Sequence, residues 1–323
     1  MPKNYTIFCL QPLLLVFLML SSNCGGDRSL KDDYQSSVSD QHVLVLGIAQ
    51  DAGYPQSGCM KACCMAHYDG KLPAEKVCSI AIIDRQNQTY WVVDATPDFK
   101  SQLHLLNTKY PDYTMGGIFL THAHMGHYTG LMHLGREAMG ASKIPVYAMP
   151  RMASFLRENG PWSQLVQLEN ISIQEITPDE NLKLNQAITV VPFLVPHRDE
   201  YSETVGYQIM GPSKNLMFLP DIDKWNKWER SIVNEIKEMN YALLDGSFFK
   251  NGEIKGRDMS LIPHPFIEES IALFNDLMPS EKSKINFIHL NHTNPLIDPN
   301  SDESKQVIEM GFAIARESNI YDL

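Results

Sequence analysis

The feature that most constrains this chain is the stretch "FLTHAHMGHYTG", residues 119–130, in which three histidines fall within six residues directly after an apolar run. A strand that ends in Thr-His-X-His places His122 and His124 on the following loop with their rings converging. His127 then comes at the first turn of the next helix. Imidazole is a good zinc ligand, and a catalytic zinc typically takes three protein ligands and a water molecule. Because the stretch holds three of the chain's 11 histidines, a metal site explains it better than solvated loop side chains.

Further ligand-type residues follow other apolar runs. His197 comes directly after "AITVVPFLVP", Asp221 ends "NLMFLPD", and His289 lies near the end of "INFIHL". Each residue taken alone could have a surface or core role. Loops after strands commonly present functional side chains, and the pattern recurs three times. We therefore expect these residues to join the histidine stretch in one site.

The apolar runs alternate with helical patterns, and several strands come in hairpin-like groups. This arrangement favours two mixed sheets with helices outside over a purely doubly wound parallel sheet, in a single domain. The expected strands are 43–49, 78–84, 90–95, 116–122, 144–150, 187–196, 204–211, 215–222, 241–248 and 285–290. The expected helices are 97–110, 128–140, 151–159, 224–239, 266–277 and 302–316.

Composition and charge limit the partners of the chain. Its 323 residues are 44% hydrophobic and 20% charged, which is enough for a sizeable buried core. The formal net charge is −11, and no basic run interrupts it. A nucleic-acid partner is therefore not expected, because backbone phosphates require a basic surface. A small molecule is the expected substrate.

The N-terminus has the pattern of a targeting segment. Lys3 is followed by the apolar run "IFCLQPLLLVFLML" and then by "LSSNCGG", whose Cys24 resembles the cysteine of a bacterial lipobox. We expect a signal peptide and lipobox at residues 1–24, a polar flexible tether at 25–41, and the folded domain at 42–323. Lipidation of Cys24 would make the protein an exported, membrane-anchored lipoprotein on the periplasmic side or cell surface. Plain secretion and an uncleaved anchor are the alternatives.

The segment "HAHMGH" resembles the His-X-His-X-Asp-His signature of the metallo-β-lactamase superfamily, and the later candidate residues follow in the order of its other motifs. The resemblance implies an α/β (α+β) fold, a four-layer αββα sandwich with metals at one edge. It also implies that His122, His124 and His197 hold one metal ion while Asp221 bridges to a second. Asp94, in "VVDATPD", resembles an aspartate that braces the metal loop of this superfamily.

The signature is broken at Gly126, where the superfamily has an aspartate. The resemblance assigns His127 and His289 to the second metal together with that aspartate, and glycine offers no ligand. We therefore expect one tightly bound metal ion and a second that is weakly bound or absent. Zinc is the expected metal, with iron or manganese as alternatives.

Three cysteines within six residues form a second candidate site. Cys59, Cys63 and Cys64 in "GCMKACC" suit a metal clip better than a disulfide framework, and a buried thiol cluster is the alternative. The segment resembles the superfamily branch that holds the phosphonate-pathway cyclic phosphodiesterases and the coenzyme PQQ synthesis B proteins. That resemblance implies a structural zinc completed by His292 of "HLNH", and His67 is an alternative ligand.

The resemblance to the PQQ synthesis B proteins extends over roughly residues 42–321, including "VGYQI", "LLDGSFF" and "HTNP". Those proteins tend to lose the leading histidines of the signature, which this chain keeps. His264 in "IPHP" resembles a pocket histidine of the phosphodiesterases, so it is a candidate substrate contact or general acid, with a purely structural role as the alternative.

Taken together, these features predict a metal-dependent hydrolase of a small ester or phosphodiester. Two other functions stay open. One is an iron-dependent oxygenase-type role related to PQQ biosynthesis, because a set of histidines and a carboxylate can also hold Fe(II). The other is a non-catalytic binding or carrier lipoprotein on the same fold.

Overall fold

The computed structural model describes residues 38–323, which form one compact unit, Val38–Leu323. Cys24 and the predicted signal peptide lie outside the described residues. Within the predicted tether, the described residues are already part of the fold, because β1 begins at Gln41 and the backbone N–H of Ser39 donates to Asp322 at 2.9 Å. Among residues 38–323, no helix is both long and apolar enough to cross a membrane.

The first of two seven-stranded sheets is antiparallel at one side and parallel at the other. Strand β2 pairs antiparallel with β1 and β3, and β3 to β6 are parallel neighbours. In spatial order the strands are β14 (Ile320–Asp322), β1 (Gln41–Gly47), β2 (Ser79–Asp84), β3 (Thr89–Val93), β4 (Thr114–Phe119), β5 (Ile144–Ala148) and β6 (Ile171–Glu175).

The second sheet is also mixed. Strands β10 to β13 are parallel neighbours, whereas β7, β8, β9 and β10 pair antiparallel. In spatial order the strands are β13 (Ala313–Ile314), β12 (Ile285–Ile288), β11 (Tyr241–Asp245), β10 (Asn215–Leu219), β9 (Val205–Met210), β8 (Thr189–Leu194) and β7 (Leu182–Lys183).

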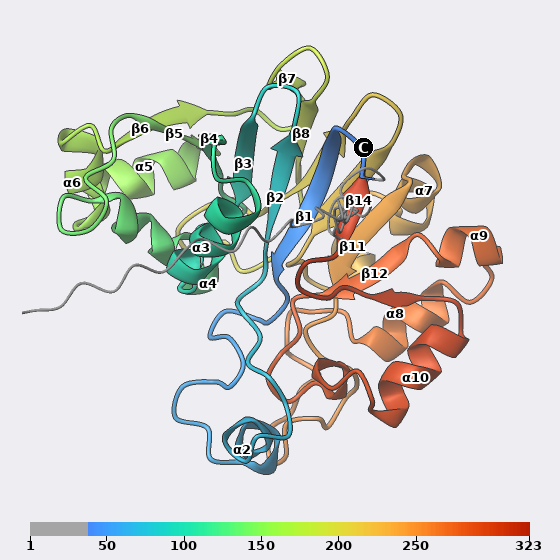
Figure 1. Cartoon of the computed structure of the whole chain (residues 1–323). Coiled ribbons are helices and arrows are strands. Elements are labelled where there is room, and N and C mark those ends of the chain that lie inside the picture. Colours follow the sequence, from blue (N-terminus) through green and yellow to red (C-terminus); the bar gives the residue numbers. More distant parts are fainter. Residues whose placement is uncertain (1–37) are drawn as a thin grey trace, which may run out of the picture. The chain divides into compact units, whose positions relative to one another are not determined.

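Helices cover the outer face of each sheet (Figure 1). Against the first sheet lie α3 (Phe99–Lys109), α4 (Met125–Tyr128), α5 (Pro150–Glu158) and α6 (Trp162–Gln167). Against the second lie α7 (Ile232–Glu238), α8 (Ile267–Leu273), α9 (Pro279–Lys282) and α10 (Asp302–Glu309). The remaining helix, α2 (Ala62–Tyr68), belongs to the long connection between β1 and β2.

The buried side chains of β1 show why two layers of sheet are needed. All seven of its residues are buried. Val43 and Val45 belong to the core between the sheets, whereas Leu44 and Leu46 belong to the core under the helices. Successive side chains of a strand point to opposite faces, so a strand that is apolar throughout must be covered on both sides. This confirms the predicted αββα sandwich.

The prediction of an α-helix over residues 128–140 is wrong. The chain makes the short α4 and then a 3-10 segment, Thr129–Leu134. The reason is the packing of Gly130, whose N–H donates to the carbonyl of Ala95 at 2.8 Å instead of continuing an α-helix. A Cβ at Gly130 would lie 2.2 Å from the carbonyl oxygen of Thr96, so this close approach requires glycine.

Three other helices are shorter than predicted, and the one expected over 266–277 is α8, which ends at Leu273. The pattern over 224–239 yields α7 only in its second half, because the hydroxyl of Ser231 caps the helix by accepting from the N–H of Asn234. The pattern over 302–316 ends with α10, since Gly311 adopts a positive φ of 92° and turns the chain into β13. Helical periodicity in the sequence did not locate these boundaries.

The strand directions bring the candidate residues together. Strands β1, β3 and β4 run the same way in the first sheet, as do β8, β10, β11 and β12 in the second. The loops after their carboxyl ends therefore meet at one edge of the sandwich. Those loops carry the site residues described next: Asp51, Asp94, His122, His124, His127, His197, Asp221 and His289.

Candidate metal centre

The first donor set consists of three histidines and one carboxylate. One donor atom from each of His122, His124, His197 and Asp221 lies within 4.8 Å of the others. His122 Nε2 and His197 Nε2 are each 3.4 Å from an oxygen of Asp221. Bonds of 2.0–2.1 Å in a tetrahedron place ligand atoms about 3.4 Å apart, so these separations suit one zinc ion.

Neighbouring groups fix which nitrogen of His122 and of His124 faces the site. Thr121 Oγ1 donates to Asp94, so it accepts from Nδ1 of His122 at 3.0 Å. On His124, Nε2 lies 3.2 Å from a carboxylate oxygen of Glu200. The nitrogens left over, His122 Nε2 and His124 Nδ1, face each other at 2.8 Å. A metal-ligating histidine typically donates its other N–H in this way.

A second donor set consists of Asp51, His127 and His289. Asp51 Oδ1 lies 3.4 Å from His127 Nε2. Asp221 lies between the two sets, because its Oδ2 is 3.3 Å from His127 Nε2 and 3.5 Å from His289 Nε2. His127, His289 and Asp221 were expected together from the sequence. Asp51 was not expected, because it follows β1 and lies outside the recognised motifs.

Unpartnered buried atoms concentrate at these two sets. Buried polar atoms are normally hydrogen bonded, so a cluster without partners indicates a ligand that they share. Among the described residues, the buried side-chain atoms here without a hydrogen-bond partner are Asp51 Oδ1, His127 Nε2, both ring nitrogens of His197, Asp221 Oδ1 and His289 Nε2. The donor types and their burial fit metal ions such as zinc.

Asp94 lies behind the histidine loop. It is fully buried after β3 and accepts from the backbone N–H of Thr121 at 2.8 Å and from His127 Nδ1 at 2.7 Å. These contacts hold the loop and leave Nε2 of His127 directed at Asp51 and Asp221. The structure thus places Asp94 where it orients a donor without itself joining the set.

His264 is buried at the border of the first donor set. Its Nδ1 is 2.8 Å from Asp245 Oδ2 and 3.2 Å from Asp221 Oδ1. Burial would by itself lower the pKa of His264, but the carboxylates of Asp245 and Asp221 outweigh it and raise that pKa to about 9. Asp245 was not singled out from the sequence, although a strand ending in aspartate, "LLDGS", carried the signal.

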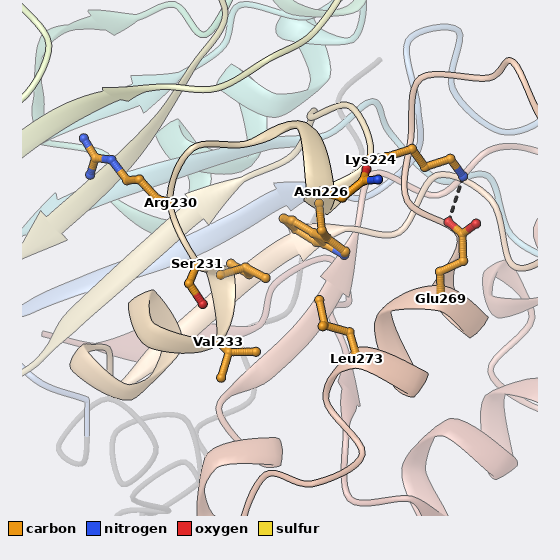
Figure 2. A pocket seen from close by; sticks show the side chains of 9 residues that line it. Lys224, Asn226, Arg230, Ser231, Val233, Glu269 and Leu273 are labelled. Carbon is orange, nitrogen blue, oxygen red and sulfur yellow. Dashed lines mark hydrogen bonds and ion pairs between the residues drawn. The ribbon is translucent and has the colours of Figure 1, made fainter.

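A polar cavity of about 270 Å³ opens beside His264. Two arginines line it, Arg198 and Arg257, together with Gln50 and Asn291. A larger cavity of about 520 Å³ lies elsewhere, between α7, α8 and the residues that precede α7. Figure 2 shows that its lining includes Arg230 and the Lys224–Glu269 ion pair, and it contains no residue of either donor set.

The cysteines form a separate set of four donors. Cys59, Cys63, Cys64 and His292 each bring one atom within 4.8 Å of the others. His292 Nδ1 is 3.3 Å from the sulfur of Cys64, and the sulfurs of Cys59 and Cys63 are 3.9 Å apart. Zinc–sulfur bonds of 2.3 Å imply sulfur atoms about 3.8 Å apart in a tetrahedron.

Helix α2 allows adjacent cysteines to share this set. Cys63 and Cys64 lie in its first turn, and all three cysteines are free thiols. His67, the alternative ligand, instead places its Nδ1 3.1 Å from the carbonyl of Leu72 and does not join the set. The structure therefore brings together the four residues expected from the sequence.

Comparisons with known proteins agree with this geometry. A family model described as "Beta-lactamase superfamily domain" matches residues 89–290. The chain belongs to the beta-lactamase superfamily. Its resemblance to the coenzyme PQQ synthesis B proteins, expected from the sequence, is confirmed by curated relatives. Coenzyme PQQ synthesis protein B of Methylorubrum populi is 23% identical over 310 residues, covering 87% of this chain and 100% of the relative.

A second sequence relative and two solved structures are also similar to this chain. The corresponding protein of Acinetobacter baumannii is 23% identical over 307 residues, covering 85% of this chain and 97% of the relative. The crystal structure of Zn²⁺-bound PqqB from Methylobacterium extorquens matches with a TM-score of 0.74 and 22% identity, over 87% of this chain and 100% of that one. A diphosphatase from the PhnP family matches with a TM-score of 0.62 and 18% identity, over 87% and 96%.

Proposed function

We propose that this superfamily member is a metal-dependent hydrolase of a small anionic ester, with a phosphodiester as the preferred substrate class. The observation that carries the proposal is the position of the arginine-lined cavity beside the first donor set. His264 belongs to the lining of that cavity and also lies 3.2 Å from Asp221 of the donor set. A substrate in the cavity would thus lie next to the metal site.

The chain's own residues have distinct tasks in this proposal. His122, His124, His197 and Asp221 would hold a metal ion, and zinc at such a site supplies Lewis acidity and a water molecule whose pKa falls to about 7. Arg198 and Arg257 line the cavity, and guanidinium groups suit the oxygens of a phosphate or carboxylate.

His264 is proposed to give a proton to the leaving oxygen. Asp245 accepts from its Nδ1, which holds the ring at the border between the cavity and the donor set. A general acid must lie within hydrogen-bond reach of the group that it protonates, and a leaving group in this cavity would meet that requirement.

The relatives support a metal-dependent reaction without identifying it. One similar structure is zinc-bound and another is a diphosphatase, so the fold supports both metal binding and cleavage of phosphate compounds in other proteins. Fold alone does not define the substrate, and the site residues of this chain carry the proposal.

The direct test compares His122→Ala with His104→Ala on a panel of phosphodiesters and lactones. His104 is an exposed histidine of α3, so its replacement controls for loss of an imidazole elsewhere. We expect His122→Ala to lower kcat/KM by at least about 1,000-fold at an unchanged unfolding temperature, since a metal contributes several kcal/mol to the transition state. Full turnover by His122→Ala would reject the mechanism.

The same panel separates the two alternative functions. Turnover that requires Fe(II) and oxygen would favour the oxygenase-type role, which is compatible with the histidines and carboxylate of the first donor set. No turnover with zinc, manganese or iron would favour a binding or carrier protein.

We also propose that the protein is exported and anchored by lipid on Cys24, on the basis of the apolar run and small-residue segment that precede it. Growth with a labelled fatty acid should label the wild-type protein but not Cys24→Ser. Absence of label from the wild type would overturn the anchor.

A further inference from the structure

We propose that Asp51 replaces the missing aspartate of the histidine signature and is the carboxylate ligand of a second metal ion. The second site would then consist of Asp51, His127, His289 and the shared Asp221. This inference concerns metal binding, so it can fail or succeed independently of the proposed hydrolase activity.

The hydrogen bonds of His127 and His289 leave one ring nitrogen of each histidine as an acceptor directed at the proposed site. His127 donates its Nδ1 proton to Asp94, so Nε2 keeps a lone pair. Ser247 Oγ donates to Asp245 at 2.8 Å and is 2.9 Å from His289 Nδ1, so it accepts from that ring and leaves its Nε2 with a lone pair as well.

Asp51 Oδ1 is a third such acceptor. It lies 3.4 Å from His127 Nε2, and all three atoms are buried without a hydrogen-bond partner among the described residues. Buried acceptors that face one another repel unless a cation lies between them. Two imidazole nitrogens with two carboxylates, from Asp51 and Asp221, form a donor set that suits zinc and other first-row divalent metals.

The space around Gly126 explains why glycine stands in the signature. A Cβ at Gly126 would lie 2.3 Å from Asp51 Oδ1 and 2.5 Å from the Cα of Asp51. Asp51 therefore occupies the space into which a side chain at position 126 would extend. Residue 126 and residue 51 are alternative sources of a carboxylate for the same place, and only one of them can have a side chain there.

The loop that carries Asp51 is held next to His289 by backbone pairing. The N–H of Gln50 donates to the carbonyl of Leu290 at 2.9 Å, and Leu290 in turn donates to Ile48 at 2.7 Å. Gly53, with a φ of 72°, turns the chain back after Asp51. These contacts fix the carboxylate against the histidines before a metal ion binds, which lowers the cost of binding.

The test measures metal content and affinity on the purified full chain. Metal-free protein is titrated with zinc by calorimetry, and bound zinc is counted by mass spectrometry after dialysis. Asp51→Asn should bind one zinc equivalent fewer than the wild type, or bind it more than about 100-fold more weakly, because even outer-shell substitutions cost 10–100-fold. Asp112→Asn, which changes an exposed carboxylate, is the matched control.

A double variant that exchanges the aspartate and the glycine between positions 51 and 126 tests the spatial argument. Asp51→Gly alone should lose the zinc equivalent of the second site, and the combination with Gly126→Asp should restore it. Gly126→Asp alone should also lose this zinc equivalent, because the side chains at positions 51 and 126 collide. Unchanged zinc number and affinity in Asp51→Asn would overturn the proposal. So would a wild-type protein that binds only one equivalent beyond the one at the cysteines. Failure of the double variant to regain zinc would overturn the exchange between positions 51 and 126.

Discussion

The cysteine set and the histidine–carboxylate sets are built in different ways. Three of the four donors of the cysteine set come from one short segment, Cys59 to Cys64, and His292 is its only distant member. The histidine–carboxylate sets draw each further donor from another strand end. His264, which lies 3.2 Å from their shared Asp221, lines the arginine-lined cavity, and His292 of the cysteine set lines the same cavity. Four donors that include three cysteine sulfurs are typical of structural zinc, whereas histidine and carboxylate donors are typical of catalytic zinc. We therefore expect the cysteine set to stabilise the fold and the histidine–carboxylate sets to carry the proposed chemistry.

The largest expected effect is a loss of folding stability when the cysteine set is broken. Cys64→Ser should lose zinc from the cysteine set and lower the free energy of unfolding by several kcal/mol, because structural zinc contributes on the order of 10 kcal/mol in small domains. The loop between β1 and β2 would lose its tie to His292. Thermal unfolding with and without a chelator, together with zinc content, measures this effect.

The control for that variant is His67→Ala, since His67 neighbours the cysteines but lies outside the donor set. It should keep its zinc and its stability. If Cys64→Ser keeps a full zinc equivalent at the cysteines, the set is a thiol cluster and the comparison fails.

The next largest effect should be a loss of catalytic rate without a loss of folding stability. His264→Gln keeps an N–H that can reach Asp245, so the fold should tolerate it, but the amide cannot donate a proton to a leaving group. We expect kcat to fall by about 100-fold or more for substrates with poor leaving groups. The loss should be much smaller for a nitrophenyl ester, whose leaving group needs no proton. An equal loss for both kinds of substrate would indicate a positioning role instead.

The smallest expected effect distinguishes the second histidine–carboxylate set from the cysteine set. Asp94→Asn can still accept from the N–H of Thr121, but its amide N–H₂ would face His127 Nδ1 as a second donor. The ring would then shift its proton to Nε2 and lose the lone pair that faces Asp51. Zinc affinity at the second set should weaken by about 10–100-fold, while the cysteine set is unaffected. Zinc titration measures the affinity of the second histidine–carboxylate set and of the cysteine set separately. An equal loss of affinity at both sets would indicate general unfolding.

Much of the fold could be predicted because its signals are local. Buried strands such as 43–49 and 78–84 are continuous apolar runs. The two-sheet architecture followed from the hairpin-like groups of strands that accompany the alternation of strands with helices. Helix ends were less predictable. Residues 128–140 have helical periodicity, yet Gly130 bonds to Ala95 from a distant segment, which no local pattern reveals.

The site residues were also predictable where their signals are local in the sequence. The histidine stretch and the cysteine segment were visible because several donors lie within one turn or loop of chain. His197, Asp221 and His289 were found because each follows a strand, and strands that run in one direction end at one edge. Asp245 also ends a strand and was not singled out, whereas Asp51 could not be found in this way because it lies in a loop four residues after β1 and belongs to no recognised motif.

The sequence by itself determined the donor types, their order and the broken signature at Gly126. Only the tertiary structure decided what fills the space beside that glycine. Asp51 reaches it from the loop after β1, and its position depends on backbone pairing with Leu290 near the other end of the chain. Ligand chemistry is a property of a residue and can be recognised locally, whereas coordination geometry depends on which distant segments pack together.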